Sequence, residues 1–215
     1  MTRTKGRPLP SGRVAPEAAL AFGLALGVAG IALLWSKSGR LPCYLTAATL
    51  VGYVGMYTPL KKITPQSTWI GAAAGATPPL IGWAAVRGDL SAQAWALFAI
   101  QFLWQIPHFL AMFWLHRQDY ARAGFRVMPV VDATGGSTAA QITIHCLTML
   151  LAAIVPFSLG MAGFVYAVLA LALSTGYLAL GMRASWTLAA VDTRRLFLAS
   201  LAYLPILFSL LLIGA

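Results

Sequence analysis

The stretch QFLWQIPHFLAMFWLHRQDYARAGFRVMPVV, from Gln101 to Val131, indicates how this chain folds. Its first half is apolar enough for a membrane helix, yet Gln101, Gln105 and His108 recur at steps of four and three residues. Residues at that spacing lie on one face of a helix. Polar side chains inside a membrane usually face a bundle interior or a water-filled cavity. We therefore predict that this stretch forms one wall of a reaction chamber, which the rest of the chain encloses.

The composition of the whole chain agrees with a membrane location. Of its 215 residues, 60% are hydrophobic and only 9% are charged, and the mean hydropathy is +0.78. Soluble domains contain about 25% charged residues. The length suits one helix bundle rather than several domains. The sequence therefore predicts an all-α membrane protein, with a single transmembrane domain over residues 1–215.

Runs of about 20 apolar residues predict membrane-spanning helices. The sequence contains about seven such runs, and an odd number of spans places the two chain termini on opposite sides of the membrane. The predicted spans are Pro16–Trp35, Leu41–Tyr57, Thr68–Val86, Ala92–Leu115, Ala139–Leu159, Gly160–Gly181 and Leu196–Ala215.

Basic residues are distributed unequally between the predicted loops. Twelve of the 15 lysines and arginines lie in the N-terminal arm and in the loops after the second, fourth and sixth spans; Lys37, Arg40 and Arg87 lie on the other side. Loops rich in Lys and Arg stay in the cytoplasm. We expect a multi-pass protein of the bacterial inner membrane, with a cytoplasmic N-terminus. The net charge of +10 thus reflects topology, not nucleic-acid binding.

Three polar clusters lie on the predicted cytoplasmic side: RTKGRPLPSGR from Arg3 to Arg13, YTPLKK from Tyr57 to Lys62, and Asp119 with its neighbouring arginines. Guanidinium groups match phosphate oxygens two at a time, and Mg²⁺ is commonly held by one or two carboxylates plus phosphate oxygens. Each cluster also has a simpler interpretation: a topogenic arm, lysines that suit a helix end, and an ion pair. Together they indicate a phosphorylated lipid substrate, with the active site facing the cytoplasm.

Several longer motifs resemble one known family. The heme branch of the UbiA-type intramembrane prenyltransferases, the protoheme IX farnesyltransferases or heme O synthases, has similar sequences at corresponding places. PPLIGW and WQIPHF are more typical of this branch than of the quinone or chlorophyll branches. The similar stretches, which cover essentially the whole chain, are RTKGRPLPSG (3–12), YTPLKKITPQ (57–66), IGAAAGATPPLIGW (70–83), WQIPHF (104–109), DYARAG (119–124) and RRLFLASLAYLPILFSLLL (194–212).

The resemblance implies a UbiA-like bundle, which has nine helices in the family. In the family, an Asp-rich motif of the form N-x-x-x-D-x-x-x-D runs directly into M-x-R-T-x-x-R-P-L, and Met1 stands at that internal methionine. The first two helices and the first Asp-rich motif are therefore absent from this sequence. We expect either that coding sequence lies upstream of Met1 or that the gene is truncated.

The resemblance also implies a reaction. A farnesyl group would move from farnesyl diphosphate to a vinyl group of heme B, with water adding a hydroxyl, and the product heme O would supply terminal oxidases. Mg²⁺ is the implied cofactor. The implied partners are the lipid bilayer and heme A synthase or the assembly of terminal oxidases.

Site residues follow from the same resemblance. Asp119 would hold Mg²⁺, and Tyr57 and Tyr120 would orient the diphosphate or face the allylic cation. The residues implied to bind diphosphate are Arg3, Arg7, Lys61, Lys62 and Arg122. The residues implied to contact heme are Trp104, His108 and His145, although each histidine also suits a hydrogen-bonded position between helices. The aromatic residues implied to shield the farnesyl chain are Trp104, Phe109, Phe113 and Trp114.

Three other functions remain open from the sequence. A transporter or channel for a phosphorylated or porphyrin solute would also use broken helices and polar groups within the membrane. Its polar residues would not be expected to gather toward one side, as they do here. The other two alternatives are a prenyltransferase of another UbiA branch, such as quinone biosynthesis, and a non-catalytic assembly factor.

Overall fold

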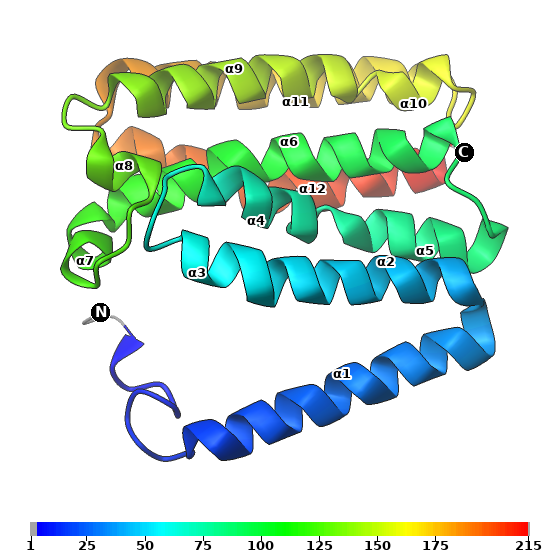
Figure 1. Ribbon diagram of the computed structural model, residues 1–215. Helices are drawn as coiled ribbons and strands as arrows, with labels where there is room; N and C mark the ends of the chain where they lie inside the picture. The colour runs from blue at the N-terminus through cyan, green and yellow to red at the C-terminus, as the bar shows by residue number, and fades with distance from the viewer. Residues whose placement is uncertain (1–3, 215) are drawn as a thin grey trace.

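Helices form the regular structure of residues 4–214, the part of the chain that this computed structural model describes (Figure 1). Four of them pack as a square in which each helix contacts two neighbours: α6 with α9, α9 with α11, α11 with α12, and α12 with α6. Leu110, Met149 and Tyr203 are among the side chains buried between them. These four helices are α6 (Ala92–Leu115), α9 (Gly136–Ala152), α11 (Phe164–Thr187) and α12 (Ala190–Ile213).

Two interrupted helical segments pack beside this square. The first consists of α2 (Arg40–Val51), the π-helical segment η2 (Gly52–Tyr57) and α3 (Thr58–Leu60), and the second of α4 (Ser67–Gly75) and α5 (Thr77–Arg87). The second lies between the first and α6.

The sequence predicts a kink at the Pro78-Pro79 pair within the span Thr68–Val86, and the structure shows a break there in the second segment. Helix α4 ends at Gly75 and α5 begins at Thr77, because a proline has no N–H to continue the helix. Side chains bond carbonyls at the break: the Thr77 hydroxyl donates to the Ala74 carbonyl (2.8 Å), and the Gln105 amide donates to the Ala72 carbonyl (3.3 Å). The break therefore leaves these buried backbone groups satisfied.

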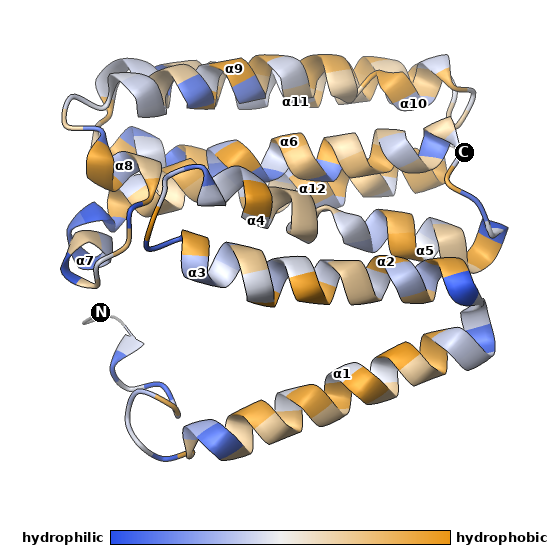
Figure 2. Cartoon of the chain, viewed as in Figure 1, coloured by the Kyte–Doolittle hydropathy of each residue, from blue (hydrophilic) through white to orange (hydrophobic). Residues whose placement is uncertain are grey.

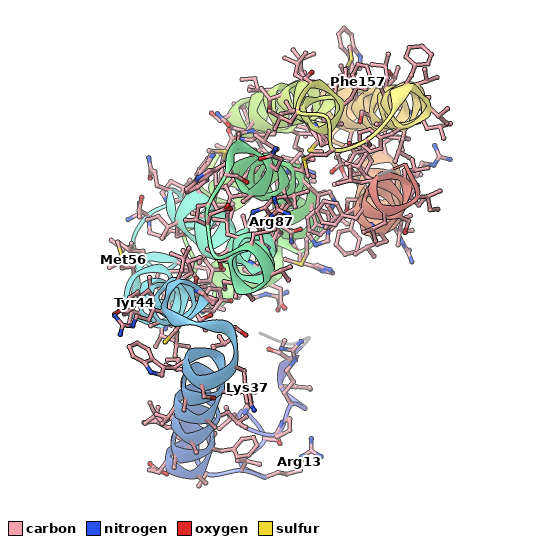
Figure 3. All side chains as sticks on the ribbon, turned by 90° about the vertical axis from the view of Figure 1, so that its right-hand side faces the viewer. Arg13, Lys37, Tyr44, Met56, Arg87 and Phe157 are labelled. Atoms are coloured by element: carbon pink, nitrogen blue, oxygen red, sulfur yellow. The ribbon has the colours of Figure 1, made fainter. Side chains whose placement is uncertain are left out.

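Helix α1 (Pro16–Ser38) stands apart from the rest of the molecule (Figures 1 and 3). It contacts α2 and α5, has no buried residue, and is apolar along most of its length (Figure 2). Gly39, with a φ of 93°, makes the turn into α2. A helix that is apolar on all sides and uncovered by protein suits a lipid environment.

The predicted spans correspond to the observed helical segments, with differences at their ends. Among residues 4–214, five helices are long and apolar enough to cross a membrane, whereas the second and third predicted spans are interrupted. The span predicted to start at Leu196 starts at Ala190, and its predecessor extends to Thr187. Asp192, in the first turn of α12, explains both changes. It accepts hydrogen bonds from Arg183 (2.9 Å) and Thr187 (3.0 Å) in the last turns of α11, so the polar residues beyond the apolar runs are still helical.

The long connection between α6 and α9 contains α7 (Arg117–Arg122) and α8 (Met128–Val131). The sequence predicts a short helix near Tyr120–Gly124, and the observed one begins earlier, at Arg117. This connection, the N-terminal arm and the end of α3 lie at the same end of the molecule (Figure 1). The Asp132 carboxylate accepts hydrogen bonds from the backbone N–H groups of Gly135 (3.1 Å) and Thr138 (2.7 Å), which fixes the start of α9.

Candidate active site

A cavity of about 810 Å³ opens at the end of the molecule that carries the N-terminal arm, α3 and α7. Segments far apart in the sequence form its walls: the arm with the start of α1, the η2–α3 segment, α6, and the α7–α8 connection. The residues that line it are Thr4, Arg7, Pro8, Leu9, Pro10, Val14, Ala19, Tyr53, Tyr57, Lys61, Phe109, Met112, Phe113, Tyr120, Phe125 and Val127.

The π-helical segment places two tyrosines on the cavity wall. The backbone N–H of Thr58 bonds the Tyr53 carbonyl, five residues earlier, and Pro59 has no N–H to restore the normal α-helical pattern. The rings of Tyr53 and Tyr57 lie 4.9 Å apart. The Tyr57 ring also packs against Gly71, where an added Cβ would lie only 2.7 Å from a ring carbon. Gly71 therefore makes room for Tyr57.

Lys61 lines this cavity close to two aromatic rings. Its Nζ is 5.6 Å from the centroid of the Tyr57 ring and 5.5 Å from that of the Phe125 ring. A cation at such a distance from a ring face is attracted by the negative charge of the π-system. The backbone of the same lysine is also held, since the N–H of Arg126 donates to the Lys61 carbonyl (3.0 Å).

Aromatic side chains continue from Lys61 around the cavity. Phe125 contacts Tyr120 (5.7 Å between ring centroids), Tyr120 contacts Phe113 (5.0 Å), and Phe113 contacts Phe109 (5.9 Å). Together with the tyrosine pair of η2 they form an aromatic arc, defined here as Tyr53, Tyr57, Phe125, Tyr120, Phe113 and Phe109. The arc gives the cavity an apolar, π-rich wall that begins at a lysine.

Arg7 brings a second cation to the cavity. The arm that carries it is folded on itself, because the Arg13 guanidinium donates to the Gly6 carbonyl (2.7 Å) and to the Ser11 hydroxyl (3.1 Å). Arg3 lies outside the described residues. Lys62 and Arg122 are exposed and do not line the cavity; the Arg122 Nε donates to the Gln118 carbonyl (3.3 Å).

Asp119 lies beside the cavity rather than on its wall. It is half-buried in a surface groove with Arg117 and Arg122, whereas its neighbour Tyr120 lines the cavity. Residues 4–214 contain no group of three His, Cys, Asp or Glu side chains placed to hold a metal ion. A single carboxylate still suits Mg²⁺, which takes its other ligands from substrate phosphates and water.

The predicted polar stripe of α6 does not face this cavity. Gln105 is buried against α4, and the Nδ1 of His108 lies 2.7 Å from the Ser200 hydroxyl of α12. The cavity wall contributed by α6 consists of Phe109, Met112 and Phe113. The stripe was expected to line the chamber, but its polar groups bond neighbouring helices instead, because an unpaired polar group in an apolar interior is costly.

The other predicted heme contacts also lie away from the cavity. Trp104 stacks on His108 (5.1 Å between centroids) and donates its indole N–H to the Ser200 carbonyl (2.7 Å). The Nδ1 of His145 bonds the Gln141 carbonyl (2.8 Å), and its ring lies 6.4 Å from that of Trp69 on α4. His108 and His145 therefore pack against different helices.

The cavity includes residues that sequence reasoning did not select. Tyr53 and Phe125 both line it. The i, i+4 spacing of Tyr53 and Tyr57 was a usable signal, whereas nothing in the sequence places Phe125 near Lys61. Of the four aromatic residues expected to shield the farnesyl chain, Phe109 and Phe113 line the cavity. Trp104 and Trp114 do not, and the Trp114 indole donates to the Leu188 carbonyl (2.9 Å).

Comparison with known proteins identifies the family of this chain. The model of the UbiA prenyltransferase family matches residues 1–211. The chain belongs to the UbiA prenyltransferase family. This membership favours an enzyme over the transporter that the broken helices also suggested.

Individual relatives of this UbiA chain carry a more specific name. A protoheme IX farnesyltransferase of Solibacter usitatus is 46% identical over 99% of this chain and 73% of its own length. A protoheme IX farnesyltransferase of Sorangium cellulosum is 42% identical over 100% of this chain and 77% of its own length. A solved structure of a digeranylgeranylglyceryl phosphate synthase has a TM-score of 0.81, with 16% identity over 99% of this chain and 74% of that one. That structure shows the UbiA-like fold.

Proposed function

We propose that this chain transfers the farnesyl group of farnesyl diphosphate to a vinyl group of heme B to form heme O. The observation that carries the proposal is the similarity of nearly the whole chain to protoheme IX farnesyltransferases, at 46% and 42% identity. The cavity supports it, because it joins two cations to an aromatic wall, as an amphiphilic diphosphate requires.

Arg7 and Lys61 are the residues that we expect to bind the diphosphate. Both line the cavity, and Lys61 is only half exposed, so its charge is less screened than that of a surface lysine. Lys62 and Arg122 would form an outer set of cations that attracts the substrate, and Arg3 is proposed to bind diphosphate from the resemblance alone. Asp119 would hold Mg²⁺, which supplies further neutralisation of the leaving diphosphate when it is bound.

The aromatic arc suits the farnesyl group. When the allylic C–O bond breaks, the diphosphate leaves with the bonding electrons and the farnesyl carbon becomes cationic. The rings of Tyr57 and Tyr120 present negative π faces to such a cation and, with Phe113, exclude water that would otherwise capture it. The π electrons of the heme vinyl group then form the new C–C bond, which leaves a cation on the adjacent carbon. Water adds to that carbon as a hydroxyl, and its proton passes to the released diphosphate.

For heme, we propose His108 with Trp104 as the main contact and His145 as a second one. The Ser200 hydroxyl donates to the Phe197 carbonyl (2.6 Å), so it accepts the hydrogen bond from the His108 Nδ1–H. A hydroxyl has only one proton to donate. Nε2 of His108 then keeps its lone pair, the form in which histidine binds metals.

Expression in a bacterium that makes heme B but no heme O tests this proposal. Membranes that contain the chain should yield hydroxyethylfarnesyl heme by mass spectrometry, and vesicles should show no uptake of farnesyl diphosphate or porphyrin. Unmodified heme B together with uptake of either solute would instead support a transporter. A prenylated quinone precursor would indicate another UbiA branch.

A further inference from the structure

The α7–α8 connection contacts the Lys61 turn at two independent points. The Phe125 ring lies 5.5 Å from the Lys61 Nζ, and the backbone N–H of the next residue, Arg126, donates to the Lys61 carbonyl (3.0 Å). One contact holds the side chain of the lysine and the other holds its backbone. Lys61 and Phe125 are 64 residues apart in the sequence, so only the fold brings them together.

Phe125 is itself held in place by the aromatic arc. Its ring meets the Tyr120 ring edge-on, with centroids 5.7 Å apart, and Tyr120 in turn meets Phe113 edge-on at 5.0 Å. Edge-on packing fixes the orientation of each ring relative to the next. The ring of Phe125 is therefore anchored through Tyr120 to α6, and the Tyr57 ring lies 5.6 Å from the same ammonium.

We propose that Phe125 is a positioning residue that holds the Lys61 ammonium at the cavity mouth, where it meets the diphosphate of the substrate. A lysine side chain has four rotatable bonds and loses considerable entropy when it is fixed. Contact with two aromatic rings restricts the lysine side chain before the diphosphate binds, so less entropy is lost on binding. The rings do not neutralise the ammonium, because a π face accepts no proton and carries no net charge. A carboxylate partner would hold the ammonium equally well but would compete with the diphosphate.

This inference rests on the proposed function for the identity of the substrate. The experiment that tests the inference does not require that function. Inorganic pyrophosphate carries the anionic part of farnesyl diphosphate without the isoprenoid. Its binding to the purified chain in nanodiscs therefore reports on the cations of the cavity, Lys61 among them, and not on contacts between the Phe125 ring and the farnesyl group. Binding is measured directly with radiolabelled pyrophosphate, so that turnover is not required.

Three variants isolate the role of the ring. Phe125→Leu keeps the apolar volume but removes the π face, Phe125→Tyr keeps the face, and Phe98→Leu is the matched control. Phe98 packs on Trp95 and Phe102 and does not line the cavity. We expect Phe125→Leu to weaken pyrophosphate binding between about twofold and thirtyfold. Phe125→Tyr and Phe98→Leu should bind as the wild type does.

A double variant separates positioning from a general structural effect. If Phe125 acts through Lys61, then Phe125→Leu should change pyrophosphate binding little once Lys61→Ala is present. An equal loss in both backgrounds would overturn the proposal, and so would unchanged binding in Phe125→Leu alone. Failure of the proposed function gives a different result: the wild type would form no farnesylated heme, while the Lys61-dependent effect of Phe125→Leu on pyrophosphate would persist.

Discussion

Lys61 is the residue that we expect to contribute most to diphosphate binding. Replacing it with alanine removes one charged contact to the leaving group and leaves Arg7 in place. A hydrogen bond to a charged group contributes about 1.5–3 kcal/mol, so the KM for farnesyl diphosphate should rise by about tenfold or more. The KM for heme should change far less. Steady-state kinetics with each substrate varied in turn measures the two KM values. Lys37→Ala is the control, because Lys37 lies in the last turn of α1, at the end far from the N-terminal arm. Equal changes in the two constants would contradict the assignment.

The proposed role of Asp119 in binding Mg²⁺ can be tested by substitution. Asp119→Asn keeps the size of the side chain but removes its charge, so product formation should be abolished at ordinary Mg²⁺ concentrations while membrane insertion stays intact. Part of the activity should return at high Mg²⁺. The measurement is turnover as a function of Mg²⁺ concentration in nanodiscs. Normal turnover of the variant at low Mg²⁺ would rule out a metal role for Asp119.

Gly71 tests whether the position of the Tyr57 ring matters for catalysis. In Gly71→Ala the new methyl group would lie 2.7 Å from the ring, which must move. Overpacking of this kind costs about 1–3 kcal/mol. We expect turnover to fall about tenfold or more, with a lower Tm. Gly82→Ala is the control, because no atom lies within 4 Å of its added Cβ. If both variants keep wild-type turnover, the Tyr57 position is not important.

At the scale of helices, Asp132 accounts for the start of α9. Its carboxylate accepts hydrogen bonds from two backbone N–H groups and from the Thr138 hydroxyl (2.9 Å). Loss of a cap costs about 0.5–2 kcal/mol. Asp132→Ala should therefore lower the Tm while Asp132→Asn recovers part of the loss, as thermal unfolding in detergent would show. An unchanged Tm in Asp132→Ala would mean that α9 does not depend on this cap.

The sequence predicts most helices but not how their polar groups are used. Apolar runs identify the membrane segments, and the Pro78-Pro79 pair identifies the break between α4 and α5, because both signals are local. The partner of a polar side chain is not local. Gln105 and His108 share a helix face, yet one bonds α4 and the other bonds α12. Periodicity alone does not distinguish a polar group bonded to another helix from one that lines a cavity.

The difference between local and non-local signals also explains which site residues could be predicted from the sequence. Four residues of the polar motifs on the predicted cytoplasmic side line one cavity: Arg7, Tyr57, Lys61 and Tyr120. Phe125 has no such signal, because its position depends on how the α7–α8 connection folds back onto α3.

At the scale of the whole molecule, we predict one orientation in the membrane. The basic arm and the cavity lie at one end, and Lys37 lies at the other end of α1 (Figures 1 and 3). The native cysteines Cys43 and Cys146 are buried, so single cysteines introduced at Ser11 and Lys37 can be labelled selectively. In intact cells, an impermeant maleimide should label Lys37→Cys but not Ser11→Cys. The opposite pattern would place the cavity mouth outside the cytoplasm.

The most direct test of the central claim follows a labelled farnesyl group. The purified chain in nanodiscs would be incubated with heme B, Mg²⁺ and deuterated farnesyl diphosphate. We predict a hydroxyethylfarnesyl heme that carries the full isotopic mass shift, with one pyrophosphate released per heme consumed. At low substrate, Lys61→Ala should form both products about tenfold more slowly or slower still. Release of pyrophosphate with unlabelled heme, or saturating binding of both substrates without any labelled heme, would contradict it.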